Sequence, residues 1–523
     1  MKKKYIAFIL LLTILVALQY SSILMYASDG VPSGFVKRLA QELAAAFFCL
    51  GGFLYLTSLT KPTFWICWPL LITGCVVYGY YSRFFKYYLD LELLSIVLGG
   101  TKEEAVQMFP YSAFGIGLLA SVLVCFLFKK AGLLFRPSKY AVSFFFLVIF
   151  ICFVSRKVGS SSVPMNLLHS LKLYAFLQTP ERQDIGQPST NEVFPNDRIF
   201  GLVRLESMTG LKHYPNGYER NTMPLVNSTK NIVNYPNFYS LGQRTSVATP
   251  FMFTRGNEEH PERAQNEESF IAQFKKLGWQ TLFESPSAAN FSKPFRFYNS
   301  IAEEADEHLY VANDEDVPAF YKAVLEKQTK PLCLTTGFNS VHRPFGRRPK
   351  TEVYYQPDCF AANLDEMLKC PIEAVNNAYD SEVRFIDKLV HQIIEATKEK
   401  EALLFFVSDH GEMLTNDGFH RPVKGDRSKS KTLRNVVAFV WASDRWIAKY
   451  PEEWKNIQKN APYYMNSEVL FHSALDCNRI DSPALDKEKS ICSATFKENE
   501  VFKKRYENAG PVDPIKEGMN INF

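Results

Sequence analysis

The chain has 523 residues, a formal net charge of +5 and 14% aromatic residues. This length exceeds a single compact core, so at least two folded units are expected. The small net charge, and the lack of a Lys/Arg block interleaved with aromatic residues, argue against nucleic acid as a partner.

Hydrophobicity divides the chain near residue 158, because the long apolar runs lie before it and charged residues dominate after it. We predict a transmembrane domain at 1–157 that contains five helices. A membrane span needs about 20 residues, so flanking aromatic and basic residues must complete the last two runs. The first run is too long for a signal peptide, and we interpret it as an uncleaved span. The five runs are 5–26, 39–59, 62–81, 113–128 and 140–154.

Basic residues in the short loops orient these spans. With a cytoplasmic N-terminus, Lys61, Lys129 and Lys130 fall on the cytoplasmic side together with the first lysines. Five crossings then place everything after residue 154 outside the membrane. A bridging helix and linker are expected at 158–196, and a folded domain at 197–523.

Five cysteines lie in this outer half. Cys359 and Cys370 flank one short loop and Cys477 and Cys492 another, which suits two local disulfides in an oxidising space. Cys333 remains, and its strand-like surroundings predict that it packs in the core.

The domain at 197–523 alternates strand-like runs with helical runs. This alternation predicts a mainly parallel sheet with helices on both faces. The runs, in chain order, are 199–205, 269–277, 281–283, 319–326, 332–336, 372–400, 402–408 and 436–441.

Two of these strands end in residue types that bind metals. One runs into Glu206, and the other runs into Asp409 and His410, with Glu412 and His420 further on. The carboxyl ends of parallel strands are where functional groups collect in such sheets. Two carboxylates and an imidazole are suitable ligands for zinc or, with more oxygen donors, for manganese or magnesium.

Thr245 is the candidate nucleophile. A threonine hydroxyl is unreactive at neutral pH, but coordination to a divalent cation lowers its pKa and makes the alkoxide accessible. If Thr245 opens a helix, the free N–H groups there favour an incoming phosphate. The alternative is that Thr245 is an ordinary helix N-cap.

Together these features resemble the bacterial phosphoethanolamine transferases of the alkaline phosphatase superfamily, which include the mobile colistin-resistance enzymes. Five spans, a long outer loop before the fourth, a bridging segment and a sulfatase-like α/β domain follow in the family's order over nearly the whole chain. The motifs that carry the resemblance are 206–208 (Glu-Ser-Met), 218–224 (Tyr-Glu-Arg-Asn-Thr-Met-Pro), the Thr245 segment to residue 253, 378–380 (Ala-Tyr-Asp) and 408–412 (Ser-Asp-His-Gly-Glu).

The resemblance implies roles for particular residues. It implies a tightly held zinc ion whose ligands are Glu206, Thr245, Asp409 and His410, with Thr245 becoming phosphorylated. It also implies that His342 and His420 handle the donor phosphate or a second zinc ion.

The chain departs from the family pattern in four places. Arg343 and Arg421 follow the two histidines where the family commonly has glycine, and Phe251 stands where a cysteine often clamps the nucleophile loop. The Asn and Lys that help to hold phosphoethanolamine in some members have no clear match at 284–293. These departures concern the head group and the acceptor rather than the metal chemistry.

The resemblance implies an inner-membrane enzyme whose catalytic domain lies in the periplasm. Metal-bound Thr245 would take phosphoethanolamine from phosphatidylethanolamine, release diacylglycerol and pass the group to lipid A, a core sugar or another envelope glycan. Two alternatives stay open: a phosphoglycerol transferase of the same superfamily, and a catalytically inactive relative that binds or scaffolds at the envelope.

Overall fold

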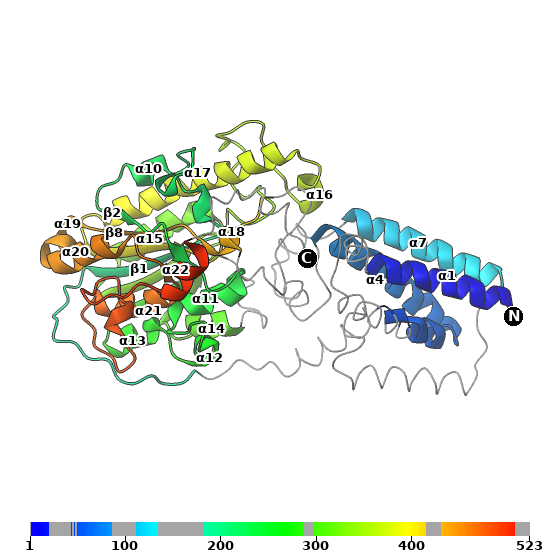
Figure 1. The fold of residues 1–523 in the computed structure, drawn as a ribbon, viewed down its shortest axis with the longest axis horizontal. Helices are drawn as coiled ribbons and strands as arrows, with labels where there is room; N and C mark the ends of the chain where they lie inside the picture. Colours follow the sequence, from blue (N-terminus) through cyan, green and yellow to red (C-terminus); the bar gives the residue numbers. More distant parts are fainter. Residues whose placement is uncertain are drawn as a thin grey trace.

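The computed structural model describes residues 2–19, 43, 46–47, 50–85, 111–133, 182–286, 296–414 and 430–507. Three helices of the first part match three of the predicted spans: α1 (Lys2–Gln19), α4 (Lys61–Phe85) and α7 (Tyr111–Lys130) (Figure 1). Within the described residues, two helices are long and apolar enough to cross a membrane, at 61–80 and 111–130. The predicted span at 39–59 is described only in part, and those at 140–154 and the bridging helix lie outside the described residues. A count of five spans therefore stays a prediction.

The α4 helix packs against both α1 and α7. Trp68 is fully buried between them, where its ring contacts Phe64 and Phe128 and its indole N–H donates to the carbonyl of Leu54 at 2.9 Å. Large apolar side chains such as Leu70 and Leu119 point outward instead. Helices that are apolar on their exposed face as well as on their buried face are typical of membrane spans.

The second part of the chain is built on a seven-stranded sheet with the order β2-β8-β7-β1-β6-β4-β5. Strand β8 runs antiparallel to both of its neighbours, and the remaining pairs are parallel, so the prediction of a mainly parallel sheet is confirmed. The strands are β1 (Arg198–Leu205), β2 (Ile232–Asn234), β4 (Gln280–Ser285), β5 (Glu307–Tyr310), β6 (Leu332–Gly337), β7 (Glu401–Ser408) and β8 (Ala438–Ala442); β3 (Phe238–Tyr239) and β9 (Met465–Asn466) form a separate pair.

Helices cover both faces of this sheet, and strand β1 shows how the two cores are filled. Ile199 and Val203 point into one apolar core and Phe200 and Leu202 into the other, as the alternation of side chains along a strand requires. The first core is closed by α10 (Pro224–Asn227), α15 (Val317–Glu326) and α17 (Ile372–Thr397), and the second by α11 (Thr245–Phe253), α13 (Phe270–Lys276), α14 (Arg296–Ala302), α19 (Asp444–Lys449), α20 (Pro451–Asn460) and α21 (Glu468–Asp476). The remaining helices are α12 (Pro261–Asn266), α16 (Leu364–Met367), α18 (Lys431–Arg434), α22 (Glu500–Tyr506) and the 3₁₀ turns Gly210–Lys212, Tyr214–Asn216, Asp314–Asp316 and Lys487–Lys489.

The predicted runs match strands β1, β4, β6, β7 and β8 and helices α13, α15 and α17. Strands β2 and β5 were not predicted, because both are short strands at the edges of the sheet and are partly exposed. Residues from 182 to 196, expected to form a linker, pair with the sheet domain through Gln183 with Glu267 and Ser189 with Asp481.

Both predicted disulfides are confirmed. The Cα atoms of Cys359 and Cys370 lie 6.0 Å apart and those of Cys477 and Cys492 lie 5.4 Å apart. Cys333 is 1% exposed in β6, and burial raises the pKa of its thiol, so the prediction of a core role is also confirmed.

Replacing the buried pair Cys477 and Cys492 by serine is expected to lower the stability of the sheet domain by about 2–4 kcal/mol. The disulfide ties α21 to the loop that follows it, closing a loop of 15 residues. Thermal unfolding of the wild-type chain and of the double serine variant, both full-length, oxidised and in detergent, checks this. An unchanged melting temperature would contradict a structural role.

Candidate metal and nucleophile site

The pairing of β1 with β7 brings the two predicted metal-binding segments together. The strands are parallel, with Leu205 opposite Ser408, so Glu206 and Asp409 both emerge at the carboxyl edge of the sheet. Both side chains are buried, with exposures of 2% and 0%. The convergence therefore follows from the strand register and not from a flexible loop.

Glu206, Asp409 and His410 form a cluster of potential ligands. One ligand atom from each lies within 4.8 Å of the others, and all three residues are buried. The Nε2 atom of His410 lies 3.5 Å from Oε1 of Glu206 and 3.6 Å from Oδ2 of Asp409. Two carboxylates and one imidazole at this spacing could hold a divalent ion such as zinc.

The geometry of His410 also suits a metal ligand. Its Nδ1 atom lies 2.9 Å from the carbonyl of Gly411, and because a carbonyl only accepts, Nδ1 carries the proton. The Nε2 atom then presents its lone pair to the cluster. Gly411 cannot carry a side chain, because a Cβ atom there would lie 1.9 Å from the carbonyl oxygen of Thr432.

Arg204 supplies a buried positive charge beside the two carboxylates. Its Nη1 atom lies 2.5 Å from Oε2 of Glu206 and 3.3 Å from Oδ2 of Asp409. Burial lowers the pKa of the Arg204 guanidinium, but the charges of Asp409 and Glu206 outweigh this effect and raise it above its ordinary value. Arg204 is therefore a permanent cation that offsets part of the negative charge of the cluster.

Thr245 reaches the same cluster from another part of the chain. Its Oγ1 atom lies 3.3 Å from Nε2 of His410 and 3.4 Å from Oε2 of Glu206. The preceding turn is fastened to the second ligand strand, because the Ser240 hydroxyl donates to the carbonyl of Asp409. Thr245 is half-buried, so it is reachable from solvent.

Helix α11 begins at Thr245. The N-cap is Arg244, which has extended backbone angles of φ −153° and ψ 148°. The alternative interpretation, that Thr245 is an ordinary N-cap, is therefore wrong. Thr245 occupies the first helical turn, where backbone N–H groups lack helical acceptors and favour an anion.

Of the two remaining predicted histidines, the structure describes only His342. His342 is half-buried, and its Nδ1 atom lies 2.6 Å from the carbonyl of Arg343, but it is not a member of the ligand cluster. His420 and Arg421 lie outside the described residues. The roles of both histidines stay predictions.

Two of the departures from the family pattern have visible structural consequences. Arg343 is fully buried, with its Nε atom 3.6 Å from Oε1 of Glu412 and a hydrogen bond to the carbonyl of Met413. Phe251 packs against the aromatic cluster around Tyr239 and Phe502. Apolar packing of Phe251 thus holds helix α11 where the resembling family often has a cysteine.

Glu284 is a further buried carboxyl group near this edge of the sheet. It is 1% exposed, and its Oε2 atom accepts from the N–H of Gly337 at 3.0 Å. Burial raises its pKa to about 8, and the nearby charge of Asp314 adds to the effect. At neutral pH the protonated form of Glu284 therefore predominates.

This protonation predicts a pH dependence of stability. Because the folded-state pKa lies above the ordinary value of 4.5, the proton on Glu284 stabilises the fold at low pH, and this contribution is lost between about pH 4.5 and 8. The Glu284→Gln variant has no proton to lose at this position, so its free energy of unfolding should not fall for this reason as the pH rises. Its stability relative to the wild type is expected to rise by up to about 1.4 kcal/mol per pH unit in that window. Melting temperatures of both chains at pH 5 and 8 check the prediction, and a constant difference would contradict it.

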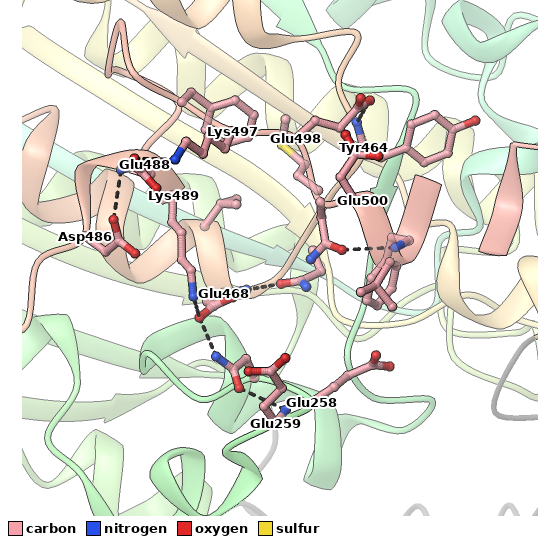
Figure 2. Close-up of a pocket in the computed structure, with 18 residues that line it drawn as sticks. Glu258, Glu259, Tyr464, Glu468, Asp486, Glu488, Lys489, Lys497, Glu498 and Glu500 are labelled. Carbon is pink, nitrogen blue, oxygen red and sulfur yellow. Dashed lines mark hydrogen bonds and ion pairs between the residues drawn. The ribbon is translucent and has the colours of Figure 1, made fainter. Parts of the chain in front are cut away.

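A cavity of about 400 Å³ lies between α21, α22 and the segment 257–259 that precedes α12, and none of the four predicted ligand residues lines it. Figure 2 labels its charged side chains, which are seven carboxylates and two lysines. Lys497 lies 2.6 Å from Glu488, and Lys489 pairs with Glu468. The cavity is thus separate from the strand-end cluster, and carboxylates outnumber lysines in its lining.

Sequence reasoning missed three residues that shape the site: Arg204, Ser207 and Ser240. The hydroxyl of Ser207 donates to Oε1 of Glu206 at 2.8 Å. Ser207 stands inside the motif 206–208, but no role was predicted for it. Arg204 gave a signal of its own, because it is a charged residue inside an apolar strand and lies two positions before a carboxylate, hence on the same face.

Comparison with known proteins places these features in context. The Sulfatase family matches residues 202–479. The chain is 23% identical over 312 residues to the Kdo(2)-lipid A phosphoethanolamine 7''-transferase of Escherichia coli (strain K12), which covers 55% of this chain and 54% of that protein. The chain thus spans about half the length of that relative. It is 24% identical over 474 residues to phosphatidylethanolamine transferase Mcr-1 of Escherichia coli, covering 78% and 83%.

Solved structures share the fold. The integral membrane lipooligosaccharide phosphoethanolamine transferase A from Neisseria meningitidis superposes with a TM-score of 0.71 at 17% identity, covering 92% of this chain and 97% of that chain. The C-terminal periplasmic domain of EcEptC from Escherichia coli, in complex with Zn, superposes with a TM-score of 0.52 at 18% identity, covering 65% and 99%. At these identities the likeness establishes the architecture.

Proposed function

Because the chain belongs to the sulfatase family, we propose that it is a zinc-dependent phosphoethanolamine transferase of the cell envelope. The observation that carries the proposal is the meeting of Thr245 with Glu206 and His410 at the carboxyl edge of the sheet. A hydroxyl, two carboxylates and an imidazole form a donor set that suits zinc. Zinc bound there would lower the pKa of the Thr245 hydroxyl and stabilise charge that develops on phosphate oxygens.

The donor and the acceptor are proposed from the relatives. The two relatives from Escherichia coli described above are named for phosphoethanolamine or phosphatidylethanolamine transfer, and one of the two names specifies lipid A. We propose phosphatidylethanolamine as the donor and lipid A or another envelope glycan as the acceptor. The membrane-type helices would keep the enzyme near both lipids.

The proposed reaction consists of two displacements at the donor phosphorus, with Thr245 as the nucleophile of the first. The Oγ1 atom of Thr245 attacks the donor phosphorus, and the bond from phosphorus to the diacylglycerol oxygen breaks. Diacylglycerol leaves with a proton, and the phosphoethanolamine group remains on Thr245. An acceptor oxygen then attacks the same phosphorus, the bond to Oγ1 breaks, and the proton of the acceptor hydroxyl returns to Oγ1. His342 and His420 are the proposed carriers of this proton and of the proton that passes from Thr245 to diacylglycerol.

We further propose that the chain resides in the inner membrane through five helices, with domains at 1–157, 158–196 and 197–523 and the sheet domain in the periplasm. The two disulfides support this placement, because structural disulfides persist in oxidising compartments. The related solved domain of EcEptC is likewise a periplasmic domain.

Intact mass spectrometry of the full chain tests the proposal. The zinc-loaded protein in detergent is incubated with phosphatidylethanolamine and, separately, with phosphatidylglycerol. A phosphoethanolamine adduct on Thr245 supports the proposed function. An adduct only with phosphatidylglycerol would assign the chain to phosphoglycerol transfer, and a chain that retains no metal and forms no adduct would be an inactive relative.

A further inference from the structure

We infer that Tyr379 is a positioning residue that holds the loop after Glu206 in the shape required for metal binding. This inference rests on the proposed zinc site. Tyr379 belongs to the segment 378–380, which the chemistry described above leaves without a role. It lies on helix α17, is 1% exposed and belongs to the core on one face of the sheet.

The Tyr379 hydroxyl holds two backbone groups of that loop. It donates to the carbonyl of Ser207 at 3.2 Å and accepts from the N–H of Thr209 at 2.9 Å. Both partners are main-chain groups of buried residues, so removing the hydroxyl takes one hydrogen bond from each of them. The hydroxyl thus fixes the peptides on either side of Met208.

Ser207 has a backbone conformation that needs such support. Its φ is 57°, in the left-handed region that residues other than glycine rarely adopt. From this conformation its N–H donates to Oδ1 of Asp409 at 3.3 Å and its hydroxyl donates to Oε1 of Glu206 at 2.8 Å. Ser207 therefore orients two of the candidate ligands, and the Tyr379 hydroxyl binds the carbonyl group of Ser207.

The next residue of α17 anchors the chain that follows the loop. Asp380 is fully buried, and its carboxylate lies 2.8 Å from Nζ of Lys212 and 2.9 Å from Nη1 of Arg220. The hydroxyl of Tyr218 donates to it at 2.8 Å. These contacts fasten the segment 212–220 to α17, so the loop is restrained at both of its ends.

Tyr379→Phe separates this role from simple packing. The ring contact with Phe345, whose centroid lies 5.6 Å away, is retained, and only the hydroxyl is lost. Groups that orient metal ligands typically change metal affinity by about 10- to 100-fold when they are removed. We expect zinc to bind Tyr379→Phe about tenfold or more weakly than the wild type, as measured by competition with a chromophoric chelator on the full chain in detergent.

Tyr321→Phe is the matched control. Tyr321 is fully buried in the same core, and its hydroxyl has no hydrogen-bond partner among the described residues. This variant should bind zinc like the wild type. Equal affinities for the wild type and a folded Tyr379→Phe would overturn the inference, whereas a wild-type chain that binds no zinc would overturn the proposed function instead.

A second measurement covers the case in which Tyr379→Phe loses thermal stability. The N–H of Thr209 loses its acceptor in this variant, so in the metal-free chain it should exchange with solvent faster than the other protected amides of the sheet domain. A uniform rise of exchange across the whole domain, without a local effect at Thr209, would also overturn the inference.

Discussion

Thr245→Ala is expected to abolish transfer and the covalent adduct while the chain stays folded. Removing a covalent nucleophile lowers turnover by roughly 10⁴-fold or more. The fold should tolerate the change, because Arg244 and not Thr245 is the N-cap of α11, and alanine favours helix. Thr245→Ser keeps a hydroxyl near Glu206 and His410 and should retain some activity. The measurement is donor turnover together with intact mass.

A second threonine of the same helix provides the control. Thr249 is fully buried, and its hydroxyl has no hydrogen-bond partner among the described residues. Thr249→Val should therefore keep both turnover and the adduct. Transfer at the wild-type rate by folded Thr245→Ala would rule out the proposed nucleophile, whatever the metal content of the protein.

The cluster of candidate ligands was predictable because its residues follow directly after two apolar strands whose pattern is visible in the sequence. Apolar strands that end in Glu206 and in Asp409 with His410 suffice to place these residues at one edge of a parallel sheet, and the register of β1 with β7 brings them together. Similarly, two local cysteine pairs were predictable from their spacing. These features depend on strand period and chain proximity alone.

Other features depend on contacts between distant segments, which leave no periodic signal. Thr245 is placed by a hydrogen bond from Ser240 to the backbone of Asp409, 169 positions away. Tyr379 acts on the backbone of Thr209 across 170 positions. The positive φ of Ser207 is equally hidden, because only glycine would have signalled it. Resemblance to a family, rather than pattern, therefore identified Thr245.

Arg204→Met is expected to destabilise the metal-free chain more than the zinc-loaded chain. Arg204 contacts Oε2 of Glu206 and Oδ2 of Asp409, and all three groups are buried. Removing one partner of a buried ion pair typically costs about 3–5 kcal/mol, because the remaining charge is left uncompensated. Zinc would supply two positive charges at the same carboxylates, so the loss should shrink when the ion is bound. Thermal unfolding with excess zinc and with a chelator measures both cases.

Arg198→Met makes the comparison specific to the metal site. Arg198 lies at the opposite end of β1, is also fully buried and pairs with Glu401 at 2.9 Å, far along the strand from Glu206. Its removal should lower the melting temperature by similar amounts with and without zinc, after allowance for the stabilisation that binding gives to any folded form. If Arg204→Met showed the same independence of zinc, the carboxylates beside Arg204 would not be metal ligands, since a bound cation would have to compensate their charge.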